Sequence, residues 1–204
     1  MASMDFAVHR TIMVVDVEGF GAACRSNRHQ VAVRAAMYRA LRRAFEQAGI
    51  PWQRCDREDR GDGVFLLVPP DVPKAHFVEV LPERLAPTLR AHNIARPAAE
   101  RIRMRMALHA GEVHYDAHGA TSASINLAFR LLDSTALKTT LRRSPGALAL
   151  IVSSWFFEEV VRHSTADVSG FRPVRVVHKE TSTTGWVSQP DAMPGTSTSP
   201  RPAA

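Results

Sequence analysis

Two aspartates stand where predicted strands begin or end, and both are candidates for holding a hard cation. Asp16 lies near the end of the apolar run 10–17, and Asp62 lies between two glycines at the start of the apolar run 63–69. If the two strands are neighbours in a sheet, the two carboxylates converge. Carboxylates together with substrate phosphates are common ligands of Mg²⁺. Taken alone, Asp62 also fits an ordinary polar turn.

A polar pair follows on a later predicted helix. Asn126 and Arg130 are four residues apart, so their side chains project from the same helix face. The planar guanidinium of arginine binds phosphate oxygens, and such groups stabilise the charge that develops in phosphoryl transfer. An exposed polar stripe on an amphipathic helix has the same spacing.

The hydrophobic periodicity predicts the elements that must position these residues. Strands are expected at residues 10–17, 52–58, 63–69, 101–115, 147–154 and, in one or two pieces, 171–187. Helices are expected at residues 27–49, 74–93, 121–133 and 155–163. The order predicts an α+β fold, a ferredoxin-like βαββαβ core with extra C-terminal strands and a helix, with helices on one face of the sheet. Within 101–115, apolar residues alternate with arginines, which predicts a half-exposed strand.

Length and composition indicate one domain over residues 1–187 of the 204-residue chain, followed by a disordered Pro/Ser/Thr-rich tail at 188–204. The formal net charge of +6 favours anionic partners such as nucleotide phosphates. There is no 18-residue apolar run and no signal-peptide pattern, so we expect no membrane partner and a cytoplasmic location. Cys24 and Cys55 are expected to be reduced.

Four motifs occur in a characteristic order: VVDVEGFG, RGDG, MALHAGEV and INLAFRLLD. Together they resemble the catalytic domain of class III nucleotidyl cyclases, the adenylyl and guanylyl cyclase family, in its bacterial form. The resemblance covers residues 8–187. It implies an enzyme that converts a nucleoside triphosphate into a 3′,5′-cyclic nucleotide and pyrophosphate for second-messenger signalling.

The resemblance also implies roles for individual residues. Asp16, Asp62 and the Val17 carbonyl would hold two Mg²⁺ or Mn²⁺ ions in each active site. Asn126 and Arg130 would be catalytic, orienting the ribose and stabilising the transition state. The family forms its active sites at a head-to-tail dimer interface, so a homodimer is expected in which one chain supplies the aspartates and the other supplies Asn126 and Arg130.

Substrate-binding roles are implied for Gly19 and Phe20 and, near the C-terminus, for Lys179 as a contact of the triphosphate. Glu58 stands where guanylyl cyclases carry glutamate and adenylyl cyclases carry lysine. The second base-reading position is Gly119, which has neither the aspartate nor the cysteine typical of purine cyclases. GTP, ATP and a pyrimidine triphosphate therefore all stay open as the substrate.

Three other interpretations compete with an active cyclase. One is a catalytically degenerate cyclase-like module that binds nucleotides or regulates a partner. Another is an RNA-binding domain with the same element order, but its strands would offer few aromatic residues for base stacking, so no nucleic-acid partner is expected. A zinc site at His109, His114 and His118 has unsuitable spacing. The aromatic residues 155–157 are expected to pack in the core or at an interface.

Overall fold

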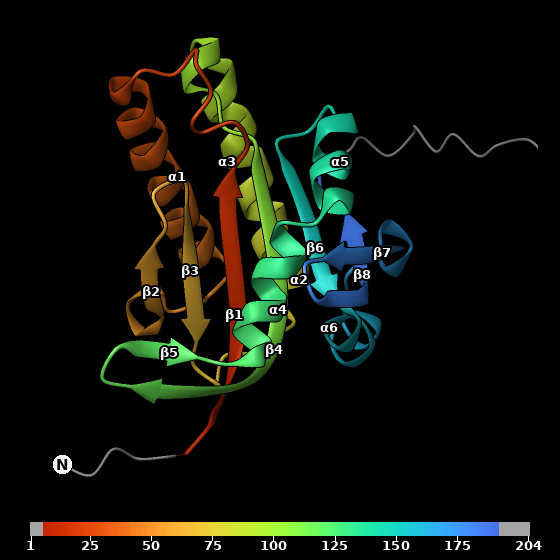
Figure 1. The fold of residues 1–204 in the computed structure, drawn as a ribbon. Coiled ribbons are helices and arrows are strands. Elements are labelled where there is room, and N and C mark those ends of the chain that lie inside the picture. Colours follow the sequence, from red (N-terminus) through yellow and green to blue (C-terminus); the bar gives the residue numbers. More distant parts are fainter. Residues whose placement is uncertain (1–5, 192–204) are drawn as a thin grey trace, which may run out of the picture.

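The computed structural model describes residues 6–191, which form an eight-stranded sheet flanked by helices (Figure 1). The strands are β1 Val8–Val17, β2 Asp56–Asp59, β3 Gly63–Val68, β4 Met104–Asp116, β5 Gly119–Thr121, β6 Leu148–Ser153, β7 Arg172–His178 and β8 Thr181–Ser188. The α-helices are α1 Asn27–Gln47, α2 His76–Glu79, α3 Leu81–Ile94, α4 Ala123–Leu132, α5 Thr135–Arg143 and α6 Ser154–Glu159.

The strand order is β2-β3-β1-β4-β6-β8-β7, and β5 pairs with the far half of β4. The first four strands are antiparallel to their neighbours, with β1 between β3 and β4, as in a ferredoxin-like core. β6 joins parallel to β4, and the β7–β8 hairpin extends the sheet. The predicted fold class is therefore confirmed.

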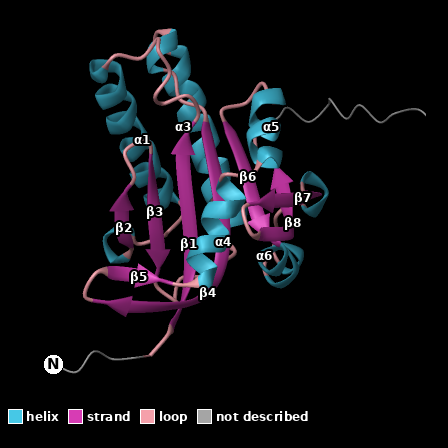
Figure 2. Cartoon of the chain, in the orientation of Figure 1, coloured by secondary structure: helices cyan, strands magenta, loops and turns pink. Residues whose placement is uncertain are grey.

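Helices cover both faces of this sheet, so the expectation of helices on one face was wrong (Figure 2). The first face is covered by α1, α2, α3 and α6, and the second by α4 and α5. Parallel strands such as β4 and β6 need a crossover connection, and α4 and α5 supply it. As a result β4 is buried on both faces from Met106 to Ala110 rather than half-exposed. The central strands thus offer no open face on which an RNA-binding domain would stack bases.

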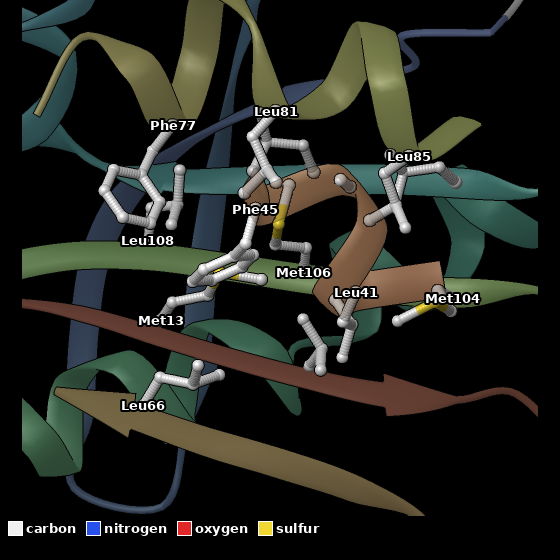
Figure 3. Packing of buried hydrophobic residues seen from close by; sticks show 14 of the residues in the cluster. Met13, Leu41, Phe45, Leu66, Phe77, Leu81, Leu85, Met104, Met106 and Leu108 are labelled. Carbon is white, nitrogen blue, oxygen red and sulfur yellow. The ribbon is translucent and has the colours of Figure 1, made fainter. Parts of the chain in front are cut away.

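The core on the first face explains why α1 forms where it does. Its residues Val33, Met37, Leu41 and Phe45 recur every four positions and are all fully buried. Figure 3 shows side chains from α1 and from the α2–α3 segment meeting those of β1, β3 and β4. Alternate residues along the strands point to this face, because successive side chains of a strand point to opposite sides.

The core on the second face positions α4, which carries the predicted catalytic pair. Ile125, Ala128 and Leu131 of α4 are buried against Ile12 and Val14 of β1, among other strand residues. Ser122 immediately precedes the helix, and its hydroxyl accepts a hydrogen bond from the Ile125 backbone N–H at 3.0 Å, as expected for an N-cap. α4 is therefore fixed across β1 and β4.

Several elements differ from the predicted ones at their ends. The segment Trp52–Arg54 forms a 3₁₀ turn, so β2 begins only at Asp56. The predicted helix 74–93 is split at Val80, just before Pro82. α5 and β5 were not predicted.

The folded part reaches at least Asp191, beyond the predicted boundary at 187. Ser188 belongs to β8, and the Asp191 carboxylate accepts a hydrogen bond from the Ala147 backbone N–H at 2.6 Å. The remainder of the predicted tail, 192–204, lies outside the described residues. Cys24 and Cys55 are both free thiols. In the described part of the chain, no helix combines the length and the apolar character needed to cross a bilayer.

Gly63 marks a close approach of β3 to β1. It is paired directly with Asp16 in the antiparallel register. A Cβ atom at Gly63 would lie 2.0 Å from the Val15 carbonyl oxygen and 2.9 Å from the Asp16 Cα, which is far inside van der Waals contact. Only glycine fits here without moving one of the two strands.

Gly63→Ala is predicted to lower the free energy of unfolding by about 3 kcal/mol, because the added methyl group must push two central strands apart. Chemical denaturation followed by circular dichroism measures this change. Gly21→Ala is the matched control, since nothing lies within 4 Å of a Cβ at that position and the change should stay within about 0.5 kcal/mol. Equal effects of the two substitutions would contradict the close approach.

Candidate active site

Asp16 occupies the centre of the site, between the ends of two neighbouring strands. It faces Gly63 of β3 on one side and Arg105 of β4 on the other, and only 8% of the residue is exposed. Burial raises the pKa of Asp16 to about 6, although the charge and hydrogen bonds of Arg105 oppose this shift. The charges of Asp62 and Asp133 raise the pKa further. The Asp16 carboxylate therefore needs a positive charge nearby to stay ionised.

Asp62 is held beside the end of β1 by the turn between β2 and β3. Its backbone carbonyl accepts a hydrogen bond from the Val17 N–H at 2.9 Å. Gly61 has a φ of +82°, a conformation that other residues rarely adopt, and its N–H donates to the Asp59 carboxylate at 2.9 Å. The turn therefore brings Asp62 next to Val17 and, through the strand register, next to Asp16.

The Val17 carbonyl lies in a tight turn that follows β1. It accepts a hydrogen bond from the Phe20 N–H at 3.3 Å, and Gly19 has a φ of +63°. Phe20 packs partly against the first core, which fixes the turn. A carbonyl oxygen has two lone pairs, so the Val17 oxygen can accept a second ligand. Asp16, Val17 and the exposed Asp62 thus lie near one another where β1 ends and β3 begins.

Arg105 forms a two-point ion pair with Asp16 that the sequence analysis missed. Its Nε lies 2.7 Å from Asp16 Oδ1 and its Nη2 lies 2.5 Å from Asp16 Oδ2. The exposed fractions of the two side chains are 13% and 11%. The alternation of 101–115 assigned Arg105 to a solvent face, and only the β1–β4 register shows that it lies opposite Asp16.

A second missed interaction anchors the turn that carries Asp62. The Asp59 Oδ2 accepts hydrogen bonds from Arg34 Nη2 at 2.6 Å and from the Tyr38 hydroxyl at 2.5 Å, and both donors belong to α1. Burial raises the pKa of Tyr38 to about 12, and the hydrogen bond to Asp59 adds to this shift. The turn is thus tied to the helix that covers the first face.

The predicted catalytic pair lies on α4, near the β7–β8 turn. Asn126 is exposed, and Arg130 Nη2 donates to Glu180 Oε1 at 2.9 Å. The Nε of Arg130 is buried and has no hydrogen-bond partner within residues 6–191. Lys179, the predicted triphosphate contact, is exposed and precedes Glu180 in the same turn. The fold therefore gathers Arg130 and Lys179 in one region.

The two predicted base-reading positions also lie together. Glu58 is an exposed residue of β2, paired with Phe65 of β3. A Cβ atom at Gly119 would lie 3.7 Å from Glu58 Oε1. The β4–β5 hairpin contacts β2 through a hydrogen bond that the Tyr115 hydroxyl donates to Asp56 Oδ2 at 2.9 Å.

The site residues fall into two groups. We call Asp16, Val17 and Asp62 the metal half, and Glu58, Gly119, Asn126, Arg130 and Lys179 the substrate half. Over the described range 6–191, no hydrogen bond or ion pair joins the carboxylates of the metal half to Asn126 or Arg130. We call these two groups the half-sites; Glu58 of the second and Asp62 of the first lie four residues apart, in β2 and in the turn after it.

The histidines and aromatic residues have other positions. His109 is buried, and its Nδ1 lies 2.8 Å from the Ser153 hydroxyl. Among residues 6–191 no three or more His, Cys, Asp and Glu side chains are grouped as metal ligands, and the metal half has only two such side chains. Phe156 and Phe157 are core residues as predicted, whereas 41% of Trp155 is exposed.

No protein-family model matches this chain, and no curated protein matches it in sequence. Solved structures do match. The guanylyl cyclase Cya2 is 18% identical, with 92% of this chain and 94% of that chain covered and a TM-score of 0.64. An adenylate/guanylate cyclase/hydrolase from Silicibacter pomeroyi is 19% identical, with 91% and 99% covered and a TM-score of 0.63.

A third match is the guanylate cyclase domain of RhGC from Catenaria anguillulae, solved in complex with GTP. It is 13% identical, with 89% of this chain and 96% of that chain covered and a TM-score of 0.58. The chain therefore has the fold of adenylyl and guanylyl cyclase catalytic domains, which confirms the fold that the sequence motifs implied.

Arg105→Gln is predicted to lower the free energy of unfolding by about 3 kcal/mol, because it leaves the Asp16 carboxylate buried without its partner. Adding Asp16→Asn removes the unpaired charge and should recover about half of that loss. Urea denaturation of the two single variants and the double variant measures the coupling. Strictly additive effects would show that the ion pair contributes nothing of its own.

Proposed function

We propose that this chain is a class III nucleotidyl cyclase, which converts a nucleoside triphosphate into a 3′,5′-cyclic nucleotide and pyrophosphate. The observation that carries the proposal is the convergence of Asp16 and Asp62. Their strands are joined in register at Gly63, and the Val17 N–H bonds to the Asp62 carbonyl. Residues 46 positions apart in the sequence are thus adjacent where β1 ends and β3 begins.

The metal half suits Mg²⁺ or Mn²⁺, because all three of its ligands are oxygen atoms. Asp16 is also buried enough that burial raises its pKa to about 6, so a cation would stabilise its ionised form. We assign two such ions to each active site, held by Asp16, Asp62 and the Val17 carbonyl. When bound, they would lower the pKa of the ribose 3′-hydroxyl and offset the charge of the triphosphate.

The substrate half supplies the other contacts that the reaction needs. The 3′-oxygen bonds to the α-phosphorus, the bond from that phosphorus to the pyrophosphate oxygen breaks, and the hydroxyl proton is released. Asn126 would hold the ribose so that the 3′-oxygen faces the phosphorus. Arg130 would stabilise the charge on the α-phosphate, and a phosphate oxygen would then replace Glu180 as the partner of its Nη2.

The remaining predicted contacts fit the same arrangement. Lys179 lies in the turn beside Arg130 and would bind the outer phosphates as a point charge. Gly19 and Phe20 form the turn next to Val17, where backbone and ring would border the phosphates. Structures with this fold that were solved with GTP and with ATPalphaS support a nucleotide ligand.

We propose that the active enzyme is a cytoplasmic homodimer. Within residues 6–191 no hydrogen bond or ion pair joins the Asp16 and Asp62 carboxylates to Asn126 or Arg130, and each half would complete a site with the opposite half of a second chain. Two-fold symmetry would then create two equal sites, because each chain carries both halves.

Incubation with each of the four nucleoside triphosphates and Mn²⁺ should yield one cyclic nucleotide and an equal amount of pyrophosphate. Chromatography with mass detection identifies both products. Asp62→Asn should lower the rate by about 100-fold, since it removes a carboxylate ligand of the metal ions that would offset the reacting charge. The absence of product with all four substrates, from folded dimeric protein, would contradict the proposal.

Asp71→Asn is the matched control for that substitution. Asp71 is an exposed aspartate paired with Arg54, and it follows the opposite end of β3 from Asp62, so its variant should keep the wild-type rate.

Mixing two inactive variants should restore activity if the sites are shared. In a heterodimer of Asp62→Ala and Arg130→Ala chains, one site carries both defects and the other carries neither. Random pairing predicts about a quarter of the wild-type activity. Heterodimers that are present by native mass spectrometry but inactive would rule out shared sites.

A further inference from the structure

Arg60 lies between the predicted base-reading residue and the helix that carries the catalytic pair. Its Nη1 is 3.4 Å from Glu58 Oε2, and its Cζ is 5.0 Å from the centre of the Phe129 ring of α4. The Arg60 backbone N–H also donates to the Gly63 carbonyl at 3.0 Å, which closes the β2–β3 turn. The guanidinium therefore contacts both Glu58 and the Phe129 ring, while the Arg60 backbone belongs to the β2–β3 turn.

The ion pair with Glu58 does not by itself account for this placement. The side chains of Arg60 and Glu58 are each 49% exposed, and they share a single long contact. Ion pairs of this kind contribute little to folding. Arginine has five N–H donors in a planar group, so one contact to Glu58 leaves donors for a ligand.

The lack of a side chain at Gly119 explains why Glu58 needs a second polar group beside it to read the base. Gly119 has no side chain, although a Cβ there would lie in contact with Glu58 Oε1. The glycine leaves the Glu58 carboxylate open to a base but contributes no hydrogen bond of its own from a side chain. Arg60 is the cationic side chain that, within the described residues, forms an ion pair with Glu58.

We propose that Arg60 is a specificity-determining residue that reads the base together with Glu58, and that the base is guanine. This inference rests on the proposed cyclase function. Guanine presents two adjacent donors, N1–H and N2–H, which the Glu58 carboxylate accepts. The neighbouring O6 is an acceptor, to which Arg60 donates.

The other bases match this pair less well. Adenine has an unprotonated N1, whose lone pair would face the Glu58 carboxylate. Cytosine has the same defect at N3. Uracil has one N–H between two carbonyl groups, so one carbonyl oxygen would oppose Glu58. A carboxylate and a guanidinium side by side thus favour GTP, because it alone satisfies both oxygens of Glu58 and a donor of Arg60.

The test compares GTP with 6-thio-GTP, in which sulfur replaces O6 and accepts hydrogen bonds weakly. Wild-type enzyme should prefer GTP by about tenfold in kcat/KM, the value of one charged hydrogen bond. Arg60→Met should lower kcat/KM for GTP by a similar factor and leave 6-thio-GTP unchanged. The methionine side chain can still pack on Phe129, so the variant separates hydrogen bonding from packing.

Arg54→Met is the control, because Arg54 is also an exposed arginine paired with a carboxylate but lies outside the site. It should keep the wild-type preference. Equal losses of kcat/KM for GTP and 6-thio-GTP in Arg60→Met would overturn the proposal, because they would show that Arg60 has only a structural role.

Binding measurements separate this inference from the cyclase proposal. Calorimetry with Mn²⁺ and the α,β-methylene analogues of GTP and ATP reports base selectivity without turnover. Selective binding of the GTP analogue that Arg60→Met abolishes would support base reading by Arg60 even if no triphosphate gave a cyclic product. Cyclic product formed with unchanged selectivity in Arg60→Met would overturn the Arg60 assignment and leave the cyclase proposal standing.

Discussion

The close approach of β3 to β1 at Gly63 is the constraint on which the candidate site depends. Because no side chain separates the strands there, the Asp62 carbonyl reaches the Val17 N–H and the turn closes over the end of β1. The same register places Asp16 opposite Gly63, and the neighbouring pairing places Arg105 on its other side. One glycine thus allows Asp16 and Asp62 to lie near each other where β1 ends and β3 begins.

The β2–β3 turn contributes to both half-sites. Asp62 belongs to the metal half, whereas Glu58 and Arg60, a few residues earlier, lie with the substrate half. The turn is tied to α1 through Asp59 and contacts α4 through Arg60, so it is held from both faces of the sheet. In the proposed homodimer each turn would therefore serve two active sites, which gives a physical reason for its density of charged residues.

The sequence could predict the parts of this arrangement that depend on local patterns. Apolar runs with strand or helix periodicity indicate the central elements, and the aspartates at strand ends indicate a cation site. The Asp16–Arg105 pair could not be predicted, because it depends on the pairing of residues 89 positions apart. The regular alternation of 101–115 was misleading for the same reason, since α4 and α5 bury the face that it assigned to solvent. α5 itself is polar in sequence and becomes a helix on the sheet through Leu137 and Leu141.

Asp16 is bound on both oxygens by Arg105, yet the proposed function requires it to bind cations. The central claim is therefore that a cation and a nucleotide replace this ion pair. The most direct measurement is anomalous X-ray diffraction from crystals grown with Mn²⁺ and the α,β-methylene analogue of GTP. We expect manganese peaks in contact with Asp16, Asp62 and the Val17 carbonyl, with Arg105 moved away from Asp16. Bound nucleotide with no manganese at these residues, and with the ion pair intact, would contradict it.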